Sequence, residues 1–161
     1  MCSVPECGLR NPEPCVLHAR WVWRLNGAAR ILPELAFIAL GSNIEPEHYL
    51  PRAVRALGEL GRLIACSNTY QNPAIADDAQ PDYLNAAVLI ETRLSPLEIR
   101  RKLREIETRL DRLRTADKFA PRTIDLDLCI YGDLQLNDPA LTLPDPDVLT
   151  RPFLALTLAE L

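Results

Sequence analysis

The chain has 161 residues, of which 48% are hydrophobic and 25% charged, and its formal net charge is −4 at pH 7. This length and composition predict one globular domain with a sizeable core. The acidic balance argues against a general nucleic-acid-binding surface, and no apolar run approaches the roughly 20 residues that span a bilayer. Five irregularly spaced cysteines argue against a secreted disulfide scaffold, so we expect a cytoplasmic protein.

The first 35 residues differ from the rest of the chain. They contain three of the five cysteines and both tryptophans, and charged residues interrupt any apolar segment that could serve as a signal peptide. We expect residues 1–35 to form a poorly ordered N-terminal extension or to reflect a misplaced start. Residues 36–161 are then the domain.

Apolar patterning predicts a strand, a helix and two further strands in the first part of this domain. Short runs of apolar, β-branched and aromatic residues indicate strands, whereas apolar residues recurring every three or four positions indicate a helix. Proline favours the first position of a helix and glycine the position after its end. The predicted elements are a strand at 36–40, a helix from Leu50 to Leu60 with Pro51 at its first position and Gly61 as its stop, and strands at 63–70 and 83–91.

A second helix is predicted to begin after Ser95, which has the side chain of an N-cap and is followed by Pro96. We interpret the charged face of this helix as solvated surface. With the strand that follows it, the order becomes βαββαβ, which is typical of a ferredoxin-like α+β fold: an antiparallel sheet with helices packed on one face. The predicted apolar face of the second helix comprises Ile99, Leu103, Ile106, Leu110 and Leu113.

The segment 122–132 reads as a strand with paired carboxylates. Since side chains alternate along a strand, Asp125 and Asp127 share one face, and Ile124, Leu126, Leu128 and Ile130 share the other. Two neighbouring acids repel each other, and Mg²⁺ readily binds one or two carboxylates together with phosphate oxygens. Arg122 adds a planar group that can bind phosphate. The simpler interpretation of Asp-x-Asp alone is an acidic, exposed edge strand.

Several motifs resemble the 6-hydroxymethyl-7,8-dihydropterin pyrophosphokinases, which transfer pyrophosphate from ATP to a pterin alcohol in folate biosynthesis. The resemblance extends from about Phe37 to Leu161. Its most specific part is the run from Ala120 to Asp127. The motifs are Gly41-Ser42-Asn43, Gln80-Pro81-Asp82-Tyr83-Leu84-Asn85-Ala86-Ala87-Val88, Ile106-Glu107 and Ala120-Pro121-Arg122-Thr123-Ile124-Asp125-Leu126-Asp127.

The resemblance implies a site for ATP and two Mg²⁺ ions, with both ions held by Asp125 and Asp127. The implied reaction is an in-line attack of the pterin hydroxyl on the β-phosphorus, which releases AMP. Without the resemblance, Arg112 and Arg114 would read as surface charges at a helix end. The implied catalytic residues are Arg112, Arg122, Asp125 and Asp127, and the implied ATP-binding residues are Glu107, Arg114, Phe119, Arg122 and Arg151.

The resemblance also implies a pterin site in which Tyr83 and Phe153 stack on the ring and Asn85 contacts its edge. Without it, the two aromatic residues would read as core and the amide as solvent-facing. The polar loops 71–81 and 112–121 match the two loops that close over the site in this family. The implied pterin-binding residues are Asn72, Pro73, Ile75, Tyr83, Asn85 and Phe153.

One departure from the family pattern leaves alternatives open. Asp145 stands where the family commonly has histidine, and an ionised carboxylate would repel phosphate. We therefore carry a second hypothesis, a catalytically weakened pterin- or nucleotide-binding protein, and a third, an RNA-binding module on the same fold. The leading hypothesis is an active monomeric pyrophosphokinase with small-molecule substrates and no nucleic-acid or membrane partner.

Overall fold

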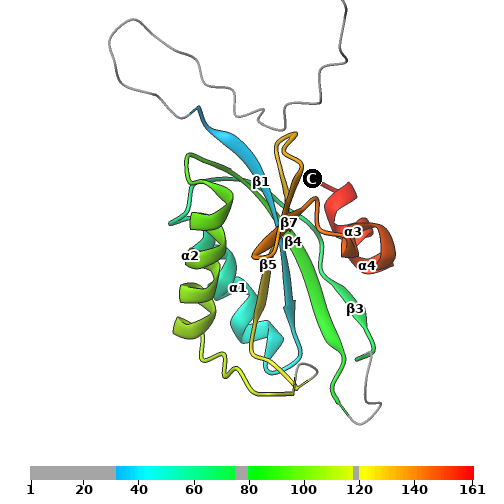
Figure 1. The fold of residues 1–161 in the computed structure, drawn as a ribbon. Helices are drawn as coiled ribbons and strands as arrows, with labels where there is room; N and C mark the ends of the chain where they lie inside the picture. Colours follow the sequence, from blue (N-terminus) through cyan, green and yellow to red (C-terminus); the bar gives the residue numbers. More distant parts are fainter. Residues whose placement is uncertain (1–31, 75–79, 118–119) are drawn as a thin grey trace, which may run out of the picture.

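The computed structural model describes residues 32–74, 80–117 and 120–161 of the chain (Figure 1). Within these residues the elements follow in the order β1 (Glu34–Ser42), α1 (Pro46–Leu57), β2 (Arg62–Cys66), β3 (Tyr70–Asn72), β4 (Tyr83–Thr92), α2 (Pro96–Arg109), β5 (Asp125–Tyr131), β6 (Leu136–Asp138), β7 (Leu141–Leu143), α3 (Asp147–Thr150) and α4 (Pro152–Ala159). Each helix of this part of the chain is too short or too polar to span a membrane.

The main sheet has the strand order β2-β4-β1-β5, and every neighbouring pair is antiparallel. The short strand β3 also pairs with β4, near the start of that strand. This topology, with α1 between β1 and β2 and α2 between β4 and β5, confirms the predicted ferredoxin-like βαββαβ fold. A β6–β7 hairpin and the helices α3 and α4 follow it.

The boundaries of the first two elements differ from the prediction. Strand β1 begins at Glu34, two residues before the predicted start of the domain, and continues to Ser42. Helix α1 begins at Pro46 and ends at Leu57, so the prediction of Pro51 at its first position is wrong. Pro46 takes that position, where its missing N–H has no helical partner to lose, and Pro51 lies inside the helix.

The predicted strand 63–70 is divided into two strands. Between them, the backbone N–H of Ser67 still donates to the carbonyl of Ala87 at 2.9 Å, but the N–H of Ala87 donates to the hydroxyl of Ser67, at 2.8 Å. Pairing with β4 then resumes at Tyr70. A side-chain hydroxyl thus replaces a backbone partner at this point, which the apolar pattern of the sequence did not indicate.

Helix α2 begins as predicted but ends earlier. Ser95 and Glu98 form a capping box, in which Glu98 accepts the N–H of Ser95 at 2.8 Å. The helix ends at Arg109, and Asp111 has a positive φ of 63° that turns the chain away from the helix axis. The prediction that Leu113 belongs to the apolar face of this helix is therefore wrong, since Leu113 lies beyond the helix and is 84% exposed.

The two faces of the sheet are covered by different helices (Figure 1). The larger core lies under α1 and α2 and includes Ile38, Leu57 and Leu103. A smaller cluster lies under α4 on the opposite face, where Leu154 and Leu158 pack against Cys129. The two predicted helices thus share one face, and the C-terminal segment adds a layer on the other face that the prediction did not include.

The alternation along β5 holds only in its first half. Ile124, Leu126 and Leu128 enter the larger core, whereas Ile130 packs against the smaller cluster. The register against β1 shifts between Phe37 and Ile38, which leaves one extra residue on β5 and reverses the faces beyond it. Asp125 and Asp127 precede this bulge, so their shared face is as predicted.

Candidate active site

Three strands bring the central polar residues together at one end of the sheet. Gly41 near the end of β1 pairs with Asn85 of β4 and with Asp125 of β5, and residues in register share a face of the sheet. A Cβ atom on Gly41 would lie 3.2 Å from the side-chain oxygen of Asn85 and 4.0 Å from the Cβ of Asp125. Glycine at this position therefore leaves room for both polar side chains.

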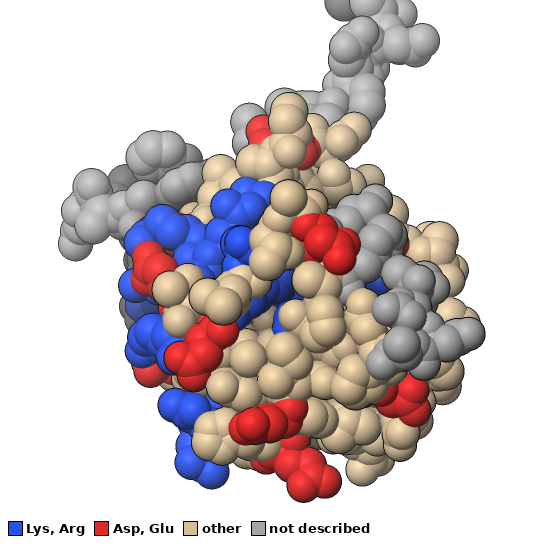
Figure 2. Space-filling model, turned by 90° about the horizontal axis from the view of Figure 1, so that it is seen from below, with Lys and Arg blue, Asp and Glu red and all other residues tan. Residues whose placement is uncertain are grey.

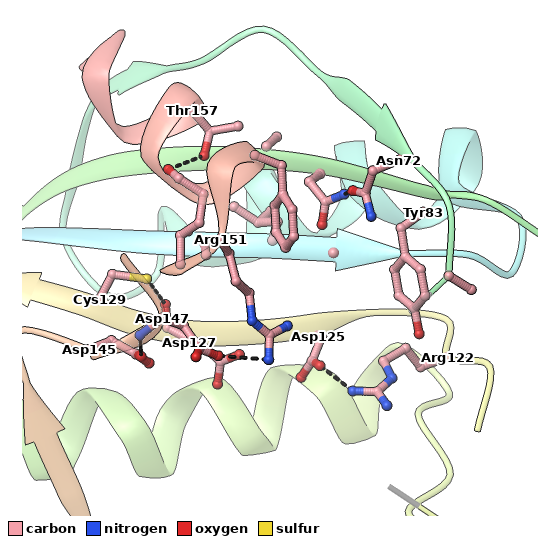
Figure 3. A pocket seen from close by; sticks show the side chains of 18 of the residues that line it. Asn72, Tyr83, Arg122, Asp125, Asp127, Cys129, Asp145, Asp147, Arg151 and Thr157 are labelled. Carbon is pink, nitrogen blue, oxygen red and sulfur yellow. Dashed lines mark hydrogen bonds and ion pairs between the residues drawn. The ribbon is translucent and has the colours of Figure 1, made fainter. Parts of the chain in front are cut away.

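A cavity of about 310 Å³ lies on this face, between the sheet and α4 (Figure 3). Its lining combines amides and aromatic rings with carboxylates and arginines. In Figure 3, Arg151 extends from the start of α4 to an ion pair with Asp147 at 2.8 Å, and Arg122 pairs with Asp125. Asp147 also lines the cavity and was not predicted for the site. Residues predicted for the site that line the cavity are Asn72, Pro73, Tyr83, Asn85, Arg122, Asp125, Asp127, Arg151 and Phe153.

Asp125 is held by two arginines. Its carboxylate forms ion pairs with Arg112 and Arg122, whose guanidinium groups bind different oxygens of Asp125. Burial opposes ionisation of this carboxyl, but the two arginines outweigh burial and lower the pKa of Asp125 below its ordinary value. Asp125 is therefore anionic at neutral pH.

Asp127 has the opposite electrostatic environment. Burial within the protein raises its pKa to about 7, and the carboxylates of Asp125, Glu107 and Asp145 add to that shift. Its side chain is still accessible from the cavity. The three neighbouring carboxylates repel the negative charge of Asp127, and a cation bound beside it would offset this repulsion.

Glu107 is a buried carboxylate behind the cavity. It forms ion pairs with Arg112, at 2.7 Å, and with Arg114, and it accepts the backbone N–H of Leu126 at 3.0 Å. Its side chain is 2% exposed and does not line the cavity. Glu107 thus fixes Arg112, which lies between this carboxylate and Asp125.

The other half of the cavity carries flat and amide side chains. Tyr83 at the start of β4 and Phe153 in α4 both line it, and the side chains of Asn85 and Asn72 are hydrogen-bonded to each other. The amide of Asn72 also donates to the carbonyl of Pro73 at 2.9 Å. Ile75 and Phe119, which were also predicted for the site, lie outside the described residues.

A second cavity of about 250 Å³ lies beside the first and shares Asp127 and Asp145 with it. Arg100 and Arg104 of α2 and Arg114 line it. Seen from this end of the molecule, Lys and Arg side chains gather to one side of a central hollow (Figure 2). Sequence analysis missed Arg100 and Arg104 by treating their helix face as solvated surface. One available signal was that Arg100 has no acid three or four residues away along the helix.

The donor set of the first cavity fits Mg²⁺. Asp125 and Asp127 provide carboxylate oxygens from a rigid strand, and no group of three His, Cys, Asp or Glu side chains suited to a metal ion occurs in the described part of the chain. Mg²⁺ commonly binds through one or two carboxylates, with water and substrate phosphates as its other ligands. A closed structural metal site would need more protein ligands.

Comparison with known proteins agrees with this geometry. The sequence model of the family "7,8-dihydro-6-hydroxymethylpterin-pyrophosphokinase (HPPK)" matches residues 37–161. The chain belongs to this HPPK family. The match includes every described residue of both cavities, from Ala39 to Thr157. It thereby confirms the resemblance drawn from the sequence motifs.

The chain is also similar to individual proteins from bacteria. A Synechocystis protein named 2-amino-4-hydroxy-6-hydroxymethyldihydropteridine pyrophosphokinase is 40% identical over 131 residues, which cover 78% of this chain and 65% of that protein. The Haemophilus influenzae protein of the same name is 37% identical over 129 residues, covering 78% of this chain and 80% of its own length. A Lactococcus lactis protein named bifunctional protein FolKE is 32% identical, and the aligned part covers 80% of this chain and 37% of that protein.

Proposed function

We propose that this chain transfers a pyrophosphoryl group from ATP to the hydroxymethyl group of 6-hydroxymethyl-7,8-dihydropterin. The hydroxyl oxygen forms a bond to the β-phosphorus, the bond between that phosphorus and the α–β bridging oxygen breaks, and AMP and a proton are released. This is the reaction named for the HPPK family and its relatives. The observation that carries the proposal is the juxtaposition, in one cavity, of an aromatic and amide half with a carboxylate and arginine half.

The aromatic and amide half fits the pterin. A flat heteroaromatic ring stacks favourably on Tyr83 and Phe153, and the amides of Asn85 and Asn72 can donate and accept hydrogen bonds at its edge. The mutual hydrogen bond of the two amides orients them before a ligand arrives. Ile75 and Pro73 complete the pterin-binding set in our proposal.

The arginines fit the triphosphate. Arg122 and Arg151 extend into the first cavity, and Arg114 lines the second cavity beside Asp127. Guanidinium groups bind phosphate oxygens in pairs and counter the charge that develops during phosphoryl transfer. Arg112 and Glu107 belong to the same set, with Glu107 holding both Arg112 and Arg114, and we assign Phe119 to the nucleotide as well.

Asp125 and Asp127 are the residues that would hold two Mg²⁺ ions. Bound Mg²⁺ would supply charge neutralisation for the ATP phosphates and for the attacking oxygen. The two side chains are two residues apart on β5, on the face that forms the cavity floor. We assign the β-phosphate to the region beside these two carboxylates, within reach of the pterin hydroxyl.

One observation favours a second candidate, a protein that binds pterin and nucleotide but turns over slowly. Asp145 lines both cavities, so a carboxylate faces the region that we assign to phosphate. A carboxylate can only accept hydrogen bonds and repels phosphate. The two candidates differ in turnover and not in binding, so an assay of AMP formation separates them.

The decisive experiment supplies the dihydropterin alcohol and ATP, with and without Mg²⁺, and measures AMP. We expect AMP only when Mg²⁺ is present. Asp125→Asn should lower turnover by about 1000-fold, roughly 4 kcal/mol of transition-state stabilisation, because the metal loses a charged ligand. Asp133→Asn is the matched control, since Asp133 is an exposed acid in the turn after β5. Pterin binding without AMP formation would support the second candidate instead.

A further inference from the structure

The side chain of Asn43 links two loops that are far apart in the sequence. Its amide nitrogen donates to the backbone carbonyl of Pro81 at 3.3 Å and lies 3.5 Å from the side-chain oxygen of Gln80. Its amide oxygen accepts the backbone N–H of Arg122 at 2.8 Å. Asn43 itself is 2% exposed and does not line either cavity.

Backbone contacts strengthen the link on one side. The N–H groups of Asn43 and Ile44 both lie 3.2 Å from the carbonyl oxygen of Arg122, which they bind. The peptide groups on both sides of Arg122 are therefore fixed to the end of β1. The guanidinium group of Arg122 projects into the first cavity and pairs with Asp125.

The two linked positions precede residues in different halves of the first cavity. Pro81 lies two residues before Tyr83, in the aromatic and amide half, and Arg122 lies three residues before Asp125, in the carboxylate and arginine half. The side chain of Asn43 contacts both segments, and the side chain of Arg122 also forms a hydrogen bond with the hydroxyl of Tyr83. The side chain of Asn43 suits this task because an amide provides a donor and an acceptor in one planar group.

We infer that Asn43 is a positioning residue that fixes the distance between the two halves of the cavity. The inference rests on the proposed function, since it assigns the pterin alcohol to one half and the phosphates to the other. Each substrate would still find its own binding groups without Asn43. The reacting atoms would be misplaced, and a misplacement of about 1 Å can cost about 100-fold in rate.

The test is Asn43→Ala, measured by kcat for AMP formation and by calorimetric binding of each ligand alone. The ligands are the dihydropterin alcohol and an ATP analogue with a methylene group between the α- and β-phosphorus. We expect kcat to fall about 100-fold. Both dissociation constants should change less than about threefold, with one ligand bound per chain. Full stoichiometry shows that the variant is folded, so loss of folded protein could not explain the fall in kcat.

Two further variants complete the design. Asn43→Ser keeps a short hydroxyl that can donate or accept a hydrogen bond but cannot span both segments, so its kcat should fall between the values of Asn43→Ala and the unmodified chain. It also serves if Asn43→Ala does not fold. Ser42→Ala is the matched control, because Ser42 is fully buried and its hydroxyl bonds only to the carbonyl of Ile44, at 3.2 Å, among the hydrogen bonds described. Ser42→Ala should lower the melting temperature and leave kcat unchanged.

The outcomes separate this inference from the proposed function. An unchanged kcat in Asn43→Ala would overturn the inference, as would a fall no larger than that of Ser42→Ala. Binding of both ligands weakened more than tenfold would also overturn it, because Asn43 would then support binding and not alignment. Absence of AMP from the unmodified chain would refute the proposed function itself.

Discussion

The face of the sheet under α1 and α2 differs from the face under α4 in what fills it. The first face carries the larger core, with fully buried side chains from β1, both helices and β4, such as Ile38, Leu57, Ile90 and Ile99. The second face has four buried residues in its cluster, and beside them lies the first cavity. Burial of apolar surface is the dominant favourable term in folding. We infer that most of the stability comes from the first face.

The strand β5 shows how one segment serves both faces. Leu126 is buried in the larger core, whereas Asp125 and Asp127 on either side of it face the cavity. Alternation along the strand lets apolar residues anchor the backbone while their neighbours remain available for a ligand. We therefore expect that substitutions on one face change mainly stability and that substitutions in the cavity change mainly catalysis.

The largest effects on stability are expected when one leucine on each face is replaced by alanine. Leu57→Ala in α1 should lower the free energy of unfolding by about 3 kcal/mol, and Leu158→Ala in α4 by about 2 kcal/mol. Leu57 is 0% exposed within the larger core, whereas Leu158 is 9% exposed and its surroundings can relax into the space. Denaturant unfolding of both variants measures the two values.

The kcat of the same two variants tests whether the change in stability leaves catalysis intact. Neither leucine lines a cavity, so kcat at a temperature where both variants are folded should match that of the unmodified chain. Equal losses of stability would contradict the proposed difference between the faces. Loss of activity in folded Leu57→Ala would show that stability and catalysis do not depend on separate faces of the sheet.

A smaller effect is expected on the flank of the first face, where α2 also borders the second cavity. Arg100→Gln should raise the KM for ATP about fivefold at low salt, roughly 1 kcal/mol, because a half-buried positive charge is removed beside the region that we assign to the nucleotide. The difference should fade near 1 M salt, where the screening length is about 3 Å. Steady-state kinetics at several salt concentrations provides the measurement.

The neighbouring arginine supplies the control for that experiment. Arg101→Gln changes the net charge equally, but Arg101 pairs with Glu105 at 2.7 Å and does not line the second cavity. It should leave the KM for ATP unchanged. If both variants raised the KM to the same extent, the effect would come from overall charge and not from a local contact.

The fold and the centre of the site were predictable from local patterns. Alternation placed Asp125 and Asp127 on one face, and the Ser95 cap fixed the start of α2. Motif resemblance supplied part of the set that lines the first cavity, but not Asp147 or Thr157. These features depend on neighbours in the sequence, or on a pattern that the family shares.

Other features depend on contacts that no local pattern reveals. The bulge that moves Ile130 to the other face arises from the register between β1 and β5. The role of Asn43 depends on Pro81 and Arg122, which lie 38 and 79 residues away. The second layer, in which α4 covers the other face of the sheet, likewise depends on contacts between segments that are distant in the sequence.

The smallest expected effect concerns the tie between α4 and the strands beneath it. The carboxylate of Glu160 accepts hydrogen bonds from the hydroxyl of Tyr70 and, at 2.6 Å, from the N–H of Asn68. These bonds lower the pKa of Glu160 below its ordinary value of 4.5. A depressed pKa in the folded state means that the stabilisation is complete above the unfolded value and is lost as pH falls through the folded value.

Glu160→Gln should therefore lower the melting temperature by about 1–2 °C near pH 7, and the difference should disappear as pH falls well below 4.5. Asp133→Asn, which removes an exposed acid elsewhere, should show no such pH-dependent difference. The effect is small because Glu160 is exposed and its hydrogen bonds compete with water. A difference that persisted unchanged at low pH would mean that the side chain acts by packing, and α4 would then be held to its face of the sheet by apolar contact alone.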